Sequence, residues 1–456
     1  MENKNDFSQG SMAKNILSLA LPMTLAQLIN VLYSVVDRMY IGHIPNASTL
    51  ALTGVGLTFP IISIVSAFAN LFGMGGAPLC SIARGKGEHE RAETIMNHSF
   101  ALLVLCSLVL TAVCLLFKEP VLYLFGASEQ TFAYADAYLS IYICGTVFVM
   151  VGLGMNNFIN SQGFGRIGMM TVLLGAVVNI VLDPLFIFVC GWGVRGAALA
   201  TVISQALSAL WVLKFLTGKH AIYRLNVQKM KLKLSLVREI VTLGLSSFIM
   251  AFTNGAVQVA CNATLQTYGG DLYVGIMTVL NSVREVLSLP ALGLTNGAQP
   301  VIGFNYGAGE YRRVRQGIRF MSVICIGYTV LAWVCTMLFP EAFIHLFNSE
   351  PELLEKGVPA LNLYFFGFFM MSLQFSGQSS FVALGKSKQA IFFSLFRKVI
   401  IVIPLTLFLP TCFGLGMDGV FLAEPVSNFI GGLACFGTML LTLWPMLKQE
   451  AQPNKV

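Results

Sequence analysis

The stretch GAPLCSIARGKGE, at Gly76–Glu88, recurs in altered form as AQPVIGFNYGAGE at Ala298–Glu310. Aligning the two places Pro78 opposite Pro300, and each copy ends in a Gly-Glu pair. Two further pairs have nearly the same separation along the chain, YLFGASE with HLFNSE and GVRGAALATVIS with GMDGVFLAEPVS. Several matches at one separation, spread along both halves, indicate that the whole chain is an internal repeat.

The composition places both copies of the repeat in a membrane. Of 456 residues, 56% are hydrophobic and 11% are charged, and the mean hydropathy is +0.76, which excludes a soluble globular protein. Apolar runs of about 20 residues, the length that a helix needs to cross about 30 Å of hydrocarbon, recur along the chain. We count twelve, at about 15–40, 50–83, 94–117, 132–161, 169–190, 196–215, 236–266, 272–304, 317–339, 358–384, 390–411 and 419–445.

These runs predict an all-α membrane protein with twelve transmembrane helices in two parallel six-helix repeats around a central cleft. The repeats are parallel because six helices return the chain to the side from which it started. Secondary transporters have this organisation, with binding sites at or near the repeat interface. The predicted segments are an N-terminal tail at 1–14, an N-lobe at 15–217, a linker at 218–235, a C-lobe at 236–445 and a C-terminal tail at 446–456.

Positive charges set the predicted orientation, because cytoplasmic loops retain lysine and arginine. With the N-terminus inside, only Arg38, Lys118, Arg195 and Lys356 fall on the outer side. We therefore expect a multi-pass protein of the cell membrane with both termini cytoplasmic, and the net charge of +7 requires no nucleic-acid partner. The ten cysteines form no CxxC pair and the five histidines no HExxH motif, so no metal site, disulfide or cofactor is predicted.

Two acidic residues interrupt the apolar runs of the first half. Asp37 lies near the outer end of the first run, and Asp183, within NIVLDPLF, lies in the outer half of the fifth. A charge at mid-membrane costs at least about 2.5 kcal/mol, so an embedded acid is a functional candidate. Pro184 cannot donate to the carbonyl of Ile180, and we expect it to bend the helix at this point.

Oxygen-bearing side chains accompany these acids at a similar depth. Asn179 precedes Asp183 by four residues and shares its helix face, and Thr201 lies about one turn into the sixth run. Two carboxylates, an amide and a hydroxyl suit a hard cation such as Na⁺, and the carboxyl pair can equally hold a proton. The alternative is that Asp183 and Asn179 only join helices through hydrogen bonds.

At these residues the sequence resembles the multidrug and toxic compound extrusion (MATE) family, along nearly the whole chain. LYSVVDRMYIG, NIVLDPLFI and GAALATVIS look like the N-lobe cation site of bacterial members, and QGFGR and GAQPVIGFNYGAGE are further matches. The resemblance implies that Asp37, Asn179, Asp183 and Thr201 are side-chain ligands and that Ala197 is a backbone ligand. Some relatives have acids for a C-lobe cation site; the corresponding helices here carry Gln258, Asn262, Gln374 and Gln378.

Other polar residues are candidates to line a substrate cavity. They are Tyr33 and Asn156 in the N-lobe and Gln258, Asn262, Asn281, Glu285, Gln374, Gln378 and Glu424 in the C-lobe. Glu424 stands at the repeat position of Thr201. Two interpretations of the C-lobe charges stay open: Arg284 or Arg397 neutralises an acid structurally, or the acids attract a cationic substrate.

The resemblance implies a cation-coupled (H⁺ or Na⁺) multidrug efflux antiporter. It would act as a monomer, without cofactors and not as an enzyme, and export organic, cationic amphiphilic compounds by alternating access. One alternative is a flippase of lipid-linked precursors from the same superfamily, which would need a cationic cavity; the acidic N-lobe disfavours it. A second is an intramembrane aspartyl-type enzyme using Asp37 and Asp183. An ATP-driven pump is disfavoured, because Ser380 replaces the first P-loop glycine before the lone GKS.

Overall fold

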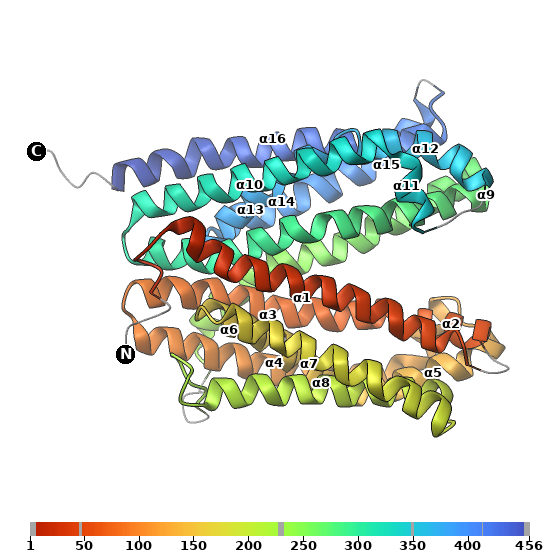
Figure 1. Ribbon diagram of the computed structural model, residues 1–456, viewed down its shortest axis with the longest axis horizontal. Helices are drawn as coiled ribbons and strands as arrows, with labels where there is room; N and C mark the ends of the chain where they lie inside the picture. Colours follow the sequence, from red (N-terminus) through yellow and green to blue (C-terminus); the bar gives the residue numbers. More distant parts are fainter. Residues whose placement is uncertain (1–5, 45–47, 227–231, 348–350, 413, 451–456) are drawn as a thin grey trace, which may run out of the picture. The chain divides into compact units, whose positions relative to one another are not determined.

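A computed structural model of the chain describes residues 6–44, 48–226, 232–347, 351–412 and 414–450, and within these ranges the chain is nearly all helical, without a strand (Figure 1). The chain divides into two units. Unit 1 contains Leu25–Gly244, and unit 2 contains Asp6–Thr24 and Leu245–Val456. The segment boundaries drawn above from the sequence, and the central cleft between the repeats, remain predictions.

Unit 1 contains the helices of the first repeat. Helix α1 (Met12–Ile41) passes from unit 2 into unit 1 and is followed by α2 (Ser48–Gly56), α3 (Phe59–Gly85), α4 (His89–Leu124), α5 (Glu129–Cys144), α6 (Thr146–Ser161), α7 (Gly165–Pro184), the π-helical turn η1 (Leu185–Val189) and α8 (Gly193–Thr217). Within the unit, α3 packs on α4 and α6, and α8 packs on α5, α6 and α7.

Unit 2 contains the helices of the second repeat. Helix α9 (Leu234–Gly307) enters it from unit 1 and is followed by α10 (Tyr311–Leu338), α11 (Pro340–His345), α12 (Pro351–Phe365), the 3-10 turn η3 (Phe368–Met370), α13 (Met371–Ala383), α14 (Ser387–Leu395), the π-helical turn η4 (Phe396–Val402), α15 (Ile403–Phe408), the 3-10 turn η5 (Leu409–Thr411) and α16 (Met417–Glu450). Helix α16 packs on α12, α13, α15 and η4.

The described helices provide twelve membrane spans. Ten are long and apolar enough to cross a membrane singly, and α5 with α6 forms an eleventh that is bent by 56°. One of the ten, α9, has 74 residues and contains two helices that meet at Gly270, where φ is 68° and ψ is −164°. Because about 20 residues suffice for one crossing, α9 supplies two spans. The fold predicted from the sequence, twelve helices in two repeats, is confirmed.

The fourth span differs from the single helix expected over 132–161. It breaks at Gly145, between α5 and α6, and a Cβ atom at this position would lie 2.6 Å from the side chain of Val202 in α8. Only glycine therefore allows α8 to pack this closely against the break. The run of apolar residues over 132–161 gives no indication of this break.

Glycine turns show that the two repeats share their backbone geometry. Gly191 and Gly193, in the turn before α8, have φ values of 69° and 52°; Gly414 and Gly416, at the repeat-related positions before α16, have φ values of 69° and 51°. Positive φ is accessible to glycine at little cost. The final helix of each unit therefore begins from the same turn.

A close backbone contact follows each of these turns. A Cβ atom on Gly196, near the start of α8, would lie 2.7 Å from the backbone of Phe186 in η1. At the repeat-related position, a Cβ atom on Gly419 would lie 2.6 to 2.9 Å from the backbone of Leu409 and Pro410. In each unit the last helix thus packs directly on the end of the preceding span.

The linker between the repeats is fastened to the first repeat by side chains. The backbone N–H of Tyr223 donates to Gln162 Oε1 at 2.9 Å, and that of Asn226 donates to Asn97 Oδ1 at 2.8 Å. Gln162 is the glutamine of the QGFGR stretch, which gives that motif a structural role. Burial raises the pKa of Tyr223 to about 12, so its phenol stays neutral.

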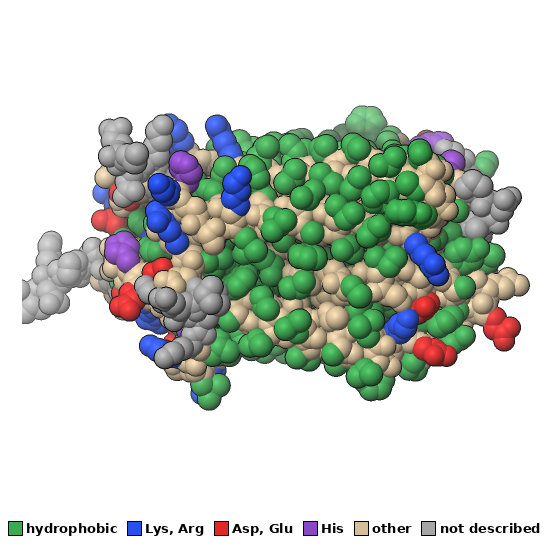
Figure 2. All heavy atoms as spheres, turned by 90° about the horizontal axis from the view of Figure 1, so that it is seen from below, with side chains coloured by type: hydrophobic (Ala, Val, Ile, Leu, Met, Phe, Trp, Pro, Cys, Tyr) green, Lys and Arg blue, Asp and Glu red, His purple; other side chains and the backbone are tan. Residues whose placement is uncertain are grey.

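The surface of the helices agrees with a membrane location. On the face in Figure 2, hydrophobic side chains form a broad band, and charged side chains gather toward its two ends. Helix α4 contributes several exposed aliphatic side chains, among them Leu108, Val109 and Leu116, the last of which is 76% exposed. An apolar surface of this extent is stable against lipid and not against water. The chain is a multi-pass membrane protein.

Candidate cation site and candidate substrate pocket

The residues expected to form a cation site meet in unit 1, where α1, α7 and α8 supply them. Asp37 lies in the last turns of α1, Asp183 in the last turn of α7, and Thr201 in the third turn of α8. Helices α7 and α8 run side by side (Figure 1). The contact of Gly196 with η1 brings the first turns of α8 next to the end of α7, and so places Thr201 near Asp183.

Asn179 links the two helices. Its Nδ2 donates to Asp183 Oδ1 and to Thr201 Oγ1, both at 3.4 Å. The first bond spans one turn of α7, as the four-residue spacing predicts. Asn179 and Asp183 are fully buried, and Thr201 is nearly so. Asn179 therefore joins α7 to α8 and also lies beside Asp183, so helix joining does not exclude a place in the expected site.

The two carboxyl groups contact each other. The side chains of Asp37 and Asp183 lie next to each other, and both residues are buried. Ionised carboxylates only accept hydrogen bonds, so such a contact requires a proton on one of the pair or a cation beside both. Within the described chain, Asp37 Oδ1, Asn179 Oδ1 and Asp183 Oδ2 have no hydrogen-bond partner.

These unpartnered oxygens fit a hard cation or a proton. Carboxylate, amide and hydroxyl oxygens are the ligands that such cations prefer. Among the residues that the structure describes, no group of three or more His, Cys, Asp or Glu side chains could hold a metal ion. Ala197, the expected backbone ligand, is fully buried one turn before Thr201.

Two tyrosines border this site. Tyr33, one turn before Asp37, lies near Gln205 and both carboxyl groups, and Tyr138 lies near Asp37 and Thr201. Asn156 lies elsewhere: its Nδ2 donates to the carbonyl of Gly168 at 3.2 Å. Gly168 is about four turns of α7 away from Asp183. Asn156 therefore joins α6 to α7, and the structure does not bring it to the carboxyl pair.

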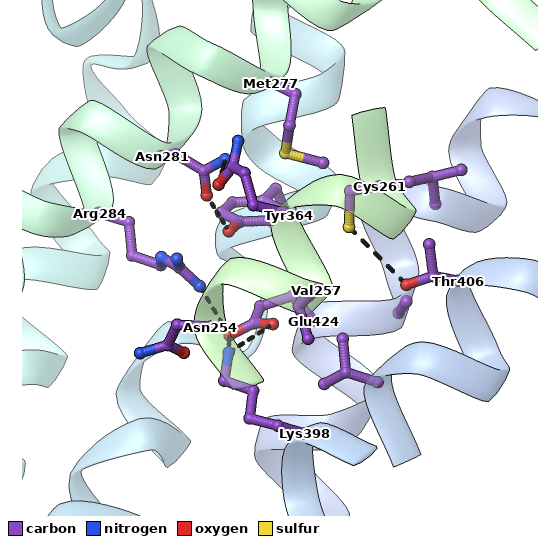
Figure 3. Close-up of a pocket in the computed structure, with 14 residues that line it drawn as sticks. Asn254, Val257, Cys261, Met277, Asn281, Arg284, Tyr364, Lys398, Thr406 and Glu424 are labelled. Atoms are coloured by element: carbon purple, nitrogen blue, oxygen red, sulfur yellow. Dashed lines mark hydrogen bonds and ion pairs between the residues drawn. The ribbon is translucent and has the colours of Figure 1, made fainter. Parts of the chain in front are cut away.

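Unit 2 contains a pocket of different character (Figure 3). Its lining comes from α9, α12, η4, α15 and α16, and consists of Asn254, Val257, Gln258, Cys261, Met277, Asn281, Arg284, Tyr364, Lys398, Val402, Thr406, Val420, Ala423 and Glu424. Among these residues Glu424 is the sole acid. Three of the seven residues predicted for a C-lobe cavity, Gln258, Asn281 and Glu424, line it.

Glu424 is held by three cationic side chains. Arg284 Nη1 and Arg397 Nη1 each lie 3.0 Å from Glu424 Oε1, and Lys398 Nζ lies 3.3 Å from the same oxygen and 3.4 Å from Oε2. Arg397 Nη1 also donates to Asn428 Oδ1 at 2.6 Å. The acid is thus neutralised structurally, the first of the two interpretations that the sequence left open.

The remaining predicted cavity residues lie outside the pocket lining. Gln374 Nε2 donates to Gln378 Oε1 at 3.1 Å and Gln378 Nε2 donates to Ser394 Oγ at 2.5 Å, so this pair joins α13 to α14. Glu285 is exposed, and Asn262 is partly buried with its Oδ1 unpartnered within the described chain. The structure therefore does not bring Glu285 to Glu424.

A sequence model of the MatE family matches the chain twice, at residues 22–185 and at residues 245–408, which together exceed half of its length. The chain belongs to the MatE family. The two matches are separated along the chain by the same interval as the repeated motifs, so they also reproduce the internal repeat. The resemblance inferred from the sequence motifs is confirmed, and the chain is a MATE family transporter.

Relatives of this MatE chain have similar length and architecture. A multidrug export protein MepA from Staphylococcus haemolyticus is 26% identical over 431 residues, which cover 93% of each chain. Among solved structures, a MATE protein in a bent conformation has a TM-score of 0.92 at 21% identity, over 99% of this chain and 100% of that one. A MOP superfamily transporter from Pyrococcus furiosus, described by the reverse polarity of its binding pocket, has a TM-score of 0.90 at 20% identity. The match covers 98% of this chain and 99% of that one.

Several site residues of this MatE transporter were not predicted from its sequence. Gln205 follows Thr201 by four residues, so the helical spacing that linked Asn179 to Asp183 was sufficient to find it. Tyr138 has no such signal, because only the packing of α5 on α8 brings it to Thr201. Lys398 has no such signal either, because 26 residues separate it from Glu424.

Proposed function

We propose that this transporter is a secondary exporter of small organic compounds, amphiphilic cations among them, driven by Na⁺ or H⁺ binding at Asp37 and Asp183. The observation that carries the proposal is that two buried carboxyl groups lie next to each other, each with one oxygen that has no hydrogen-bond partner within the described chain. Two such groups in a membrane need a bound proton or cation. A site that needs a cation responds to a gradient of that cation.

Coupling requires that the ion bind the two states of the transporter differently. Asp37, Asp183 and Thr201 belong to three helices, α1, α7 and α8. An ion that joins ligands from three helices stabilises the arrangement in which those helices lie together. We infer that ion entry from the outside shifts unit 1 between two packings and lowers its affinity for the exported compound.

Two further lines support the direction of transport and the kind of substrate. The staphylococcal relatives that match over about nine-tenths of the chain are named multidrug export proteins. The lysine and arginine distribution along the sequence favours cytoplasmic termini in a cell membrane, which orients the first helix outward. We also propose that the transporter works as a monomer, since all the ligands of the proposed cation site come from one chain.

The test is movement of ethidium into or out of proteoliposomes under an imposed Na⁺ gradient or an imposed pH gradient. We expect one of the two gradients to drive ethidium with the wild-type protein and to fail with Asp183→Asn. Glu119→Gln, which removes an exposed acid of α4, is the matched control and should transport normally. Gradient-driven transport that persists in Asp183→Asn would exclude the carboxyl pair as the coupling site.

A flippase of lipid-linked precursors is the second candidate, since it needs a cationic cavity and the unit 2 pocket contains three cationic groups around one acid. The size of the pocket opposes it. Its cavity volume of about 10 Å³ admits about one water molecule, far less than a pyrophosphate head group. Scrambling of a fluorescent lipid-linked pyrophosphate by proteoliposomes, without ethidium transport, would decide for the flippase.

A further inference from the structure

The first turns of α10 carry three arginine side chains without a partner in the part of the chain that the structure describes. Arg312, Arg315 and Arg319 form no salt bridge there, and Arg315 Nε is buried without a hydrogen-bond partner. Arg313 is different, since it donates to three backbone carbonyls at residues 7–10, at 2.9 to 3.1 Å. A guanidinium keeps its charge and has five N–H donors, so the other three arginines can bind an anion.

Two of these arginines lie on the exposed face of α10. Successive residues of a helix are about 100° apart, so Arg312 and Arg319, seven residues apart, point the same way. Val323 and Val334 continue this face, and Arg315 lies at its edge. All four residues of the face are exposed, Val323 by 58%. The opposite side of the helix holds its buried residues, which are Val314, Gly317, Ile318, Met321, Ser322, Cys325, Thr329, Ala332 and Thr336.

The face changes from charged to apolar within one turn. Arg312 and Arg319 precede Val323, and exposed apolar side chains follow it as far as Leu338. In a helix that crosses the membrane, this change marks the boundary between head groups and hydrocarbon. Arg312 lies about 10 Å further from the hydrocarbon than Arg319 along the axis. Because arginine side chains are long and extend toward polar surroundings, both guanidinium groups can reach the level of the lipid phosphates.

The repeat provides an internal comparison. The register that pairs Pro78 with Pro300 places Glu90, Glu93 and Asn97 of α4 at the positions of the three arginines. Parallel repeats start their corresponding helices on the same side of the membrane, so a preference for positive charge on that side acts on α4 and α10 alike. Orientation alone therefore does not explain why only α10 carries the arginines.

We propose that this face of α10 binds an anionic phospholipid, with Arg312 and Arg319 on its phosphate and its acyl chains along Val323 and Val334. Charge complementarity selects an anionic head group, since arginine near a membrane surface attracts anionic lipids. The apolar continuation of the face selects a lipid over a soluble anion, which would leave Val323 and Val334 without contacts. The binding does not rest on the transport function proposed above.

The experiment compares two phospholipids that have the same acyl chains and differ in net charge. The delipidated full-length protein in detergent is titrated with phosphatidylglycerol or with phosphatidylcholine, and native mass spectrometry reports the affinity for the first bound lipid. We expect the wild-type protein to prefer phosphatidylglycerol. Each arginine near anionic lipid contributes about fivefold, so Arg312→Gln combined with Arg319→Gln should lower the ratio of the two affinities by about 25-fold.

A matched pair of substitutions separates a site from general electrostatic attraction. Lys214→Gln combined with Lys219→Gln removes the same charge from exposed positions at the end of α8, and should leave the ratio nearly unchanged. Arg312→Lys combined with Arg319→Lys keeps the charge and should retain most of the preference. Should the glutamine variants unfold, phosphatidylglycerol with a photoreactive acyl chain should label the wild-type protein on α10 near Val323.

Equal affinities of the wild-type protein for the two lipids would overturn the proposal. Equal losses in the α10 pair and the α8 pair would also overturn it, because the attraction would then be general. Labelling that is absent from α10 would have the same consequence. Glycerol phosphate, which lacks acyl chains, should not displace phosphatidylglycerol; displacement would show a site for soluble anions in place of a lipid site.

Discussion

Three positions occur twice in this chain, and each set contains one acid, in surroundings of different charge. Asn179, Asp183 and Thr201 of unit 1 correspond, in the register of the repeated glycine turns, to Val402, Thr406 and Glu424 of unit 2. In unit 1 the set contributes to a pair of carboxyl groups that form no salt bridge among the described residues. In unit 2 it surrounds an acid that three cationic side chains hold.

The difference shows what the repeat keeps and what it changes. The glycine turns and the close contact of the last helix have nearly the same geometry in both units. Asp183 is replaced by Thr406, and Thr201 by Glu424, so the acid moves from the fifth helix of the repeat to the sixth. Arg397 and Lys398, in a π-helical turn of unit 2 that unit 1 lacks at that position, complete the reversal.

The largest expected effect comes from the acids of unit 1. Asp37→Asn and Asp183→Asn should each abolish gradient-driven ethidium transport, because one remaining carboxyl cannot share a proton or hold a cation as the pair does. The double variant should transport ethidium no more slowly than either single variant, since the effects of substituting residues that act as a unit are not additive. Initial transport rates of the three variants in proteoliposomes provide the measurement; additive losses would show two independent sites.

Next in size is the removal of the acid of unit 2. Glu424→Gln leaves three cationic groups without their counter-charge and should destabilise the protein by about 3 to 5 kcal/mol. The midpoint of thermal unfolding in detergent reports the loss. Adding Lys398→Met removes one cation and should restore part of the stability. A double variant less stable than Glu424→Gln would contradict the charge imbalance.

A smaller effect should follow from blocking the close helix contacts. Gly196→Val and Gly419→Val each place a branched side chain against backbone, at a cost of about 1 to 3 kcal/mol in either unit. Only Gly196→Val should also weaken ion coupling, because Gly196 positions Thr201 next to Asp183. Thermal unfolding and the ion dependence of ethidium transport separate these consequences; equal transport defects in the two variants would argue against that positioning role.

The smallest predicted change concerns the hydroxyl of the cation site. Thr201→Val keeps the shape of the side chain and removes one oxygen, so half-maximal transport should need roughly fivefold more coupling ion, which corresponds to about 1 kcal/mol. Maximal rates should stay near those of the wild type. The ion concentration at half-maximal rate is the quantity to determine. An unchanged value would remove Thr201 from the ligand set and leave it as a partner of Asn179.

Much of the candidate site in unit 1 could be predicted from the sequence, because the residues that indicate it lie close together along the chain. An acid in an apolar run is rare, and the four-residue spacing of Asn179 and Asp183 fixes a shared helix face. The repeat, the span number and the family were likewise predicted and are confirmed. The role of the assembled residues as ion ligands stays a prediction, now with a geometry that can be tested.

The pocket of unit 2 was less accessible to sequence analysis for physical reasons. Arg284 and Glu285 are neighbours in α9, and adjacent residues of a helix point in directions about 100° apart, so only one of them can face the pocket. The partners of Glu424 are 26, 27 and 140 residues away in the chain. No spacing rule connects such residues; their meeting depends on the tertiary packing of α9, η4 and α16.

The matched glycine turns before α8 and α16 also bear on how such a transporter can diversify. Since the turns and the helix contact depend on backbone geometry alone, the polar side chains a few residues away can differ between the repeats, provided that a buried charge changes together with its partners. Exchange of a handful of side chains among the repeat-related positions is then enough to alter which charges a lobe accepts. Variant libraries restricted to the three repeat-related positions of each unit are accordingly the most direct route to exporters with altered substrates.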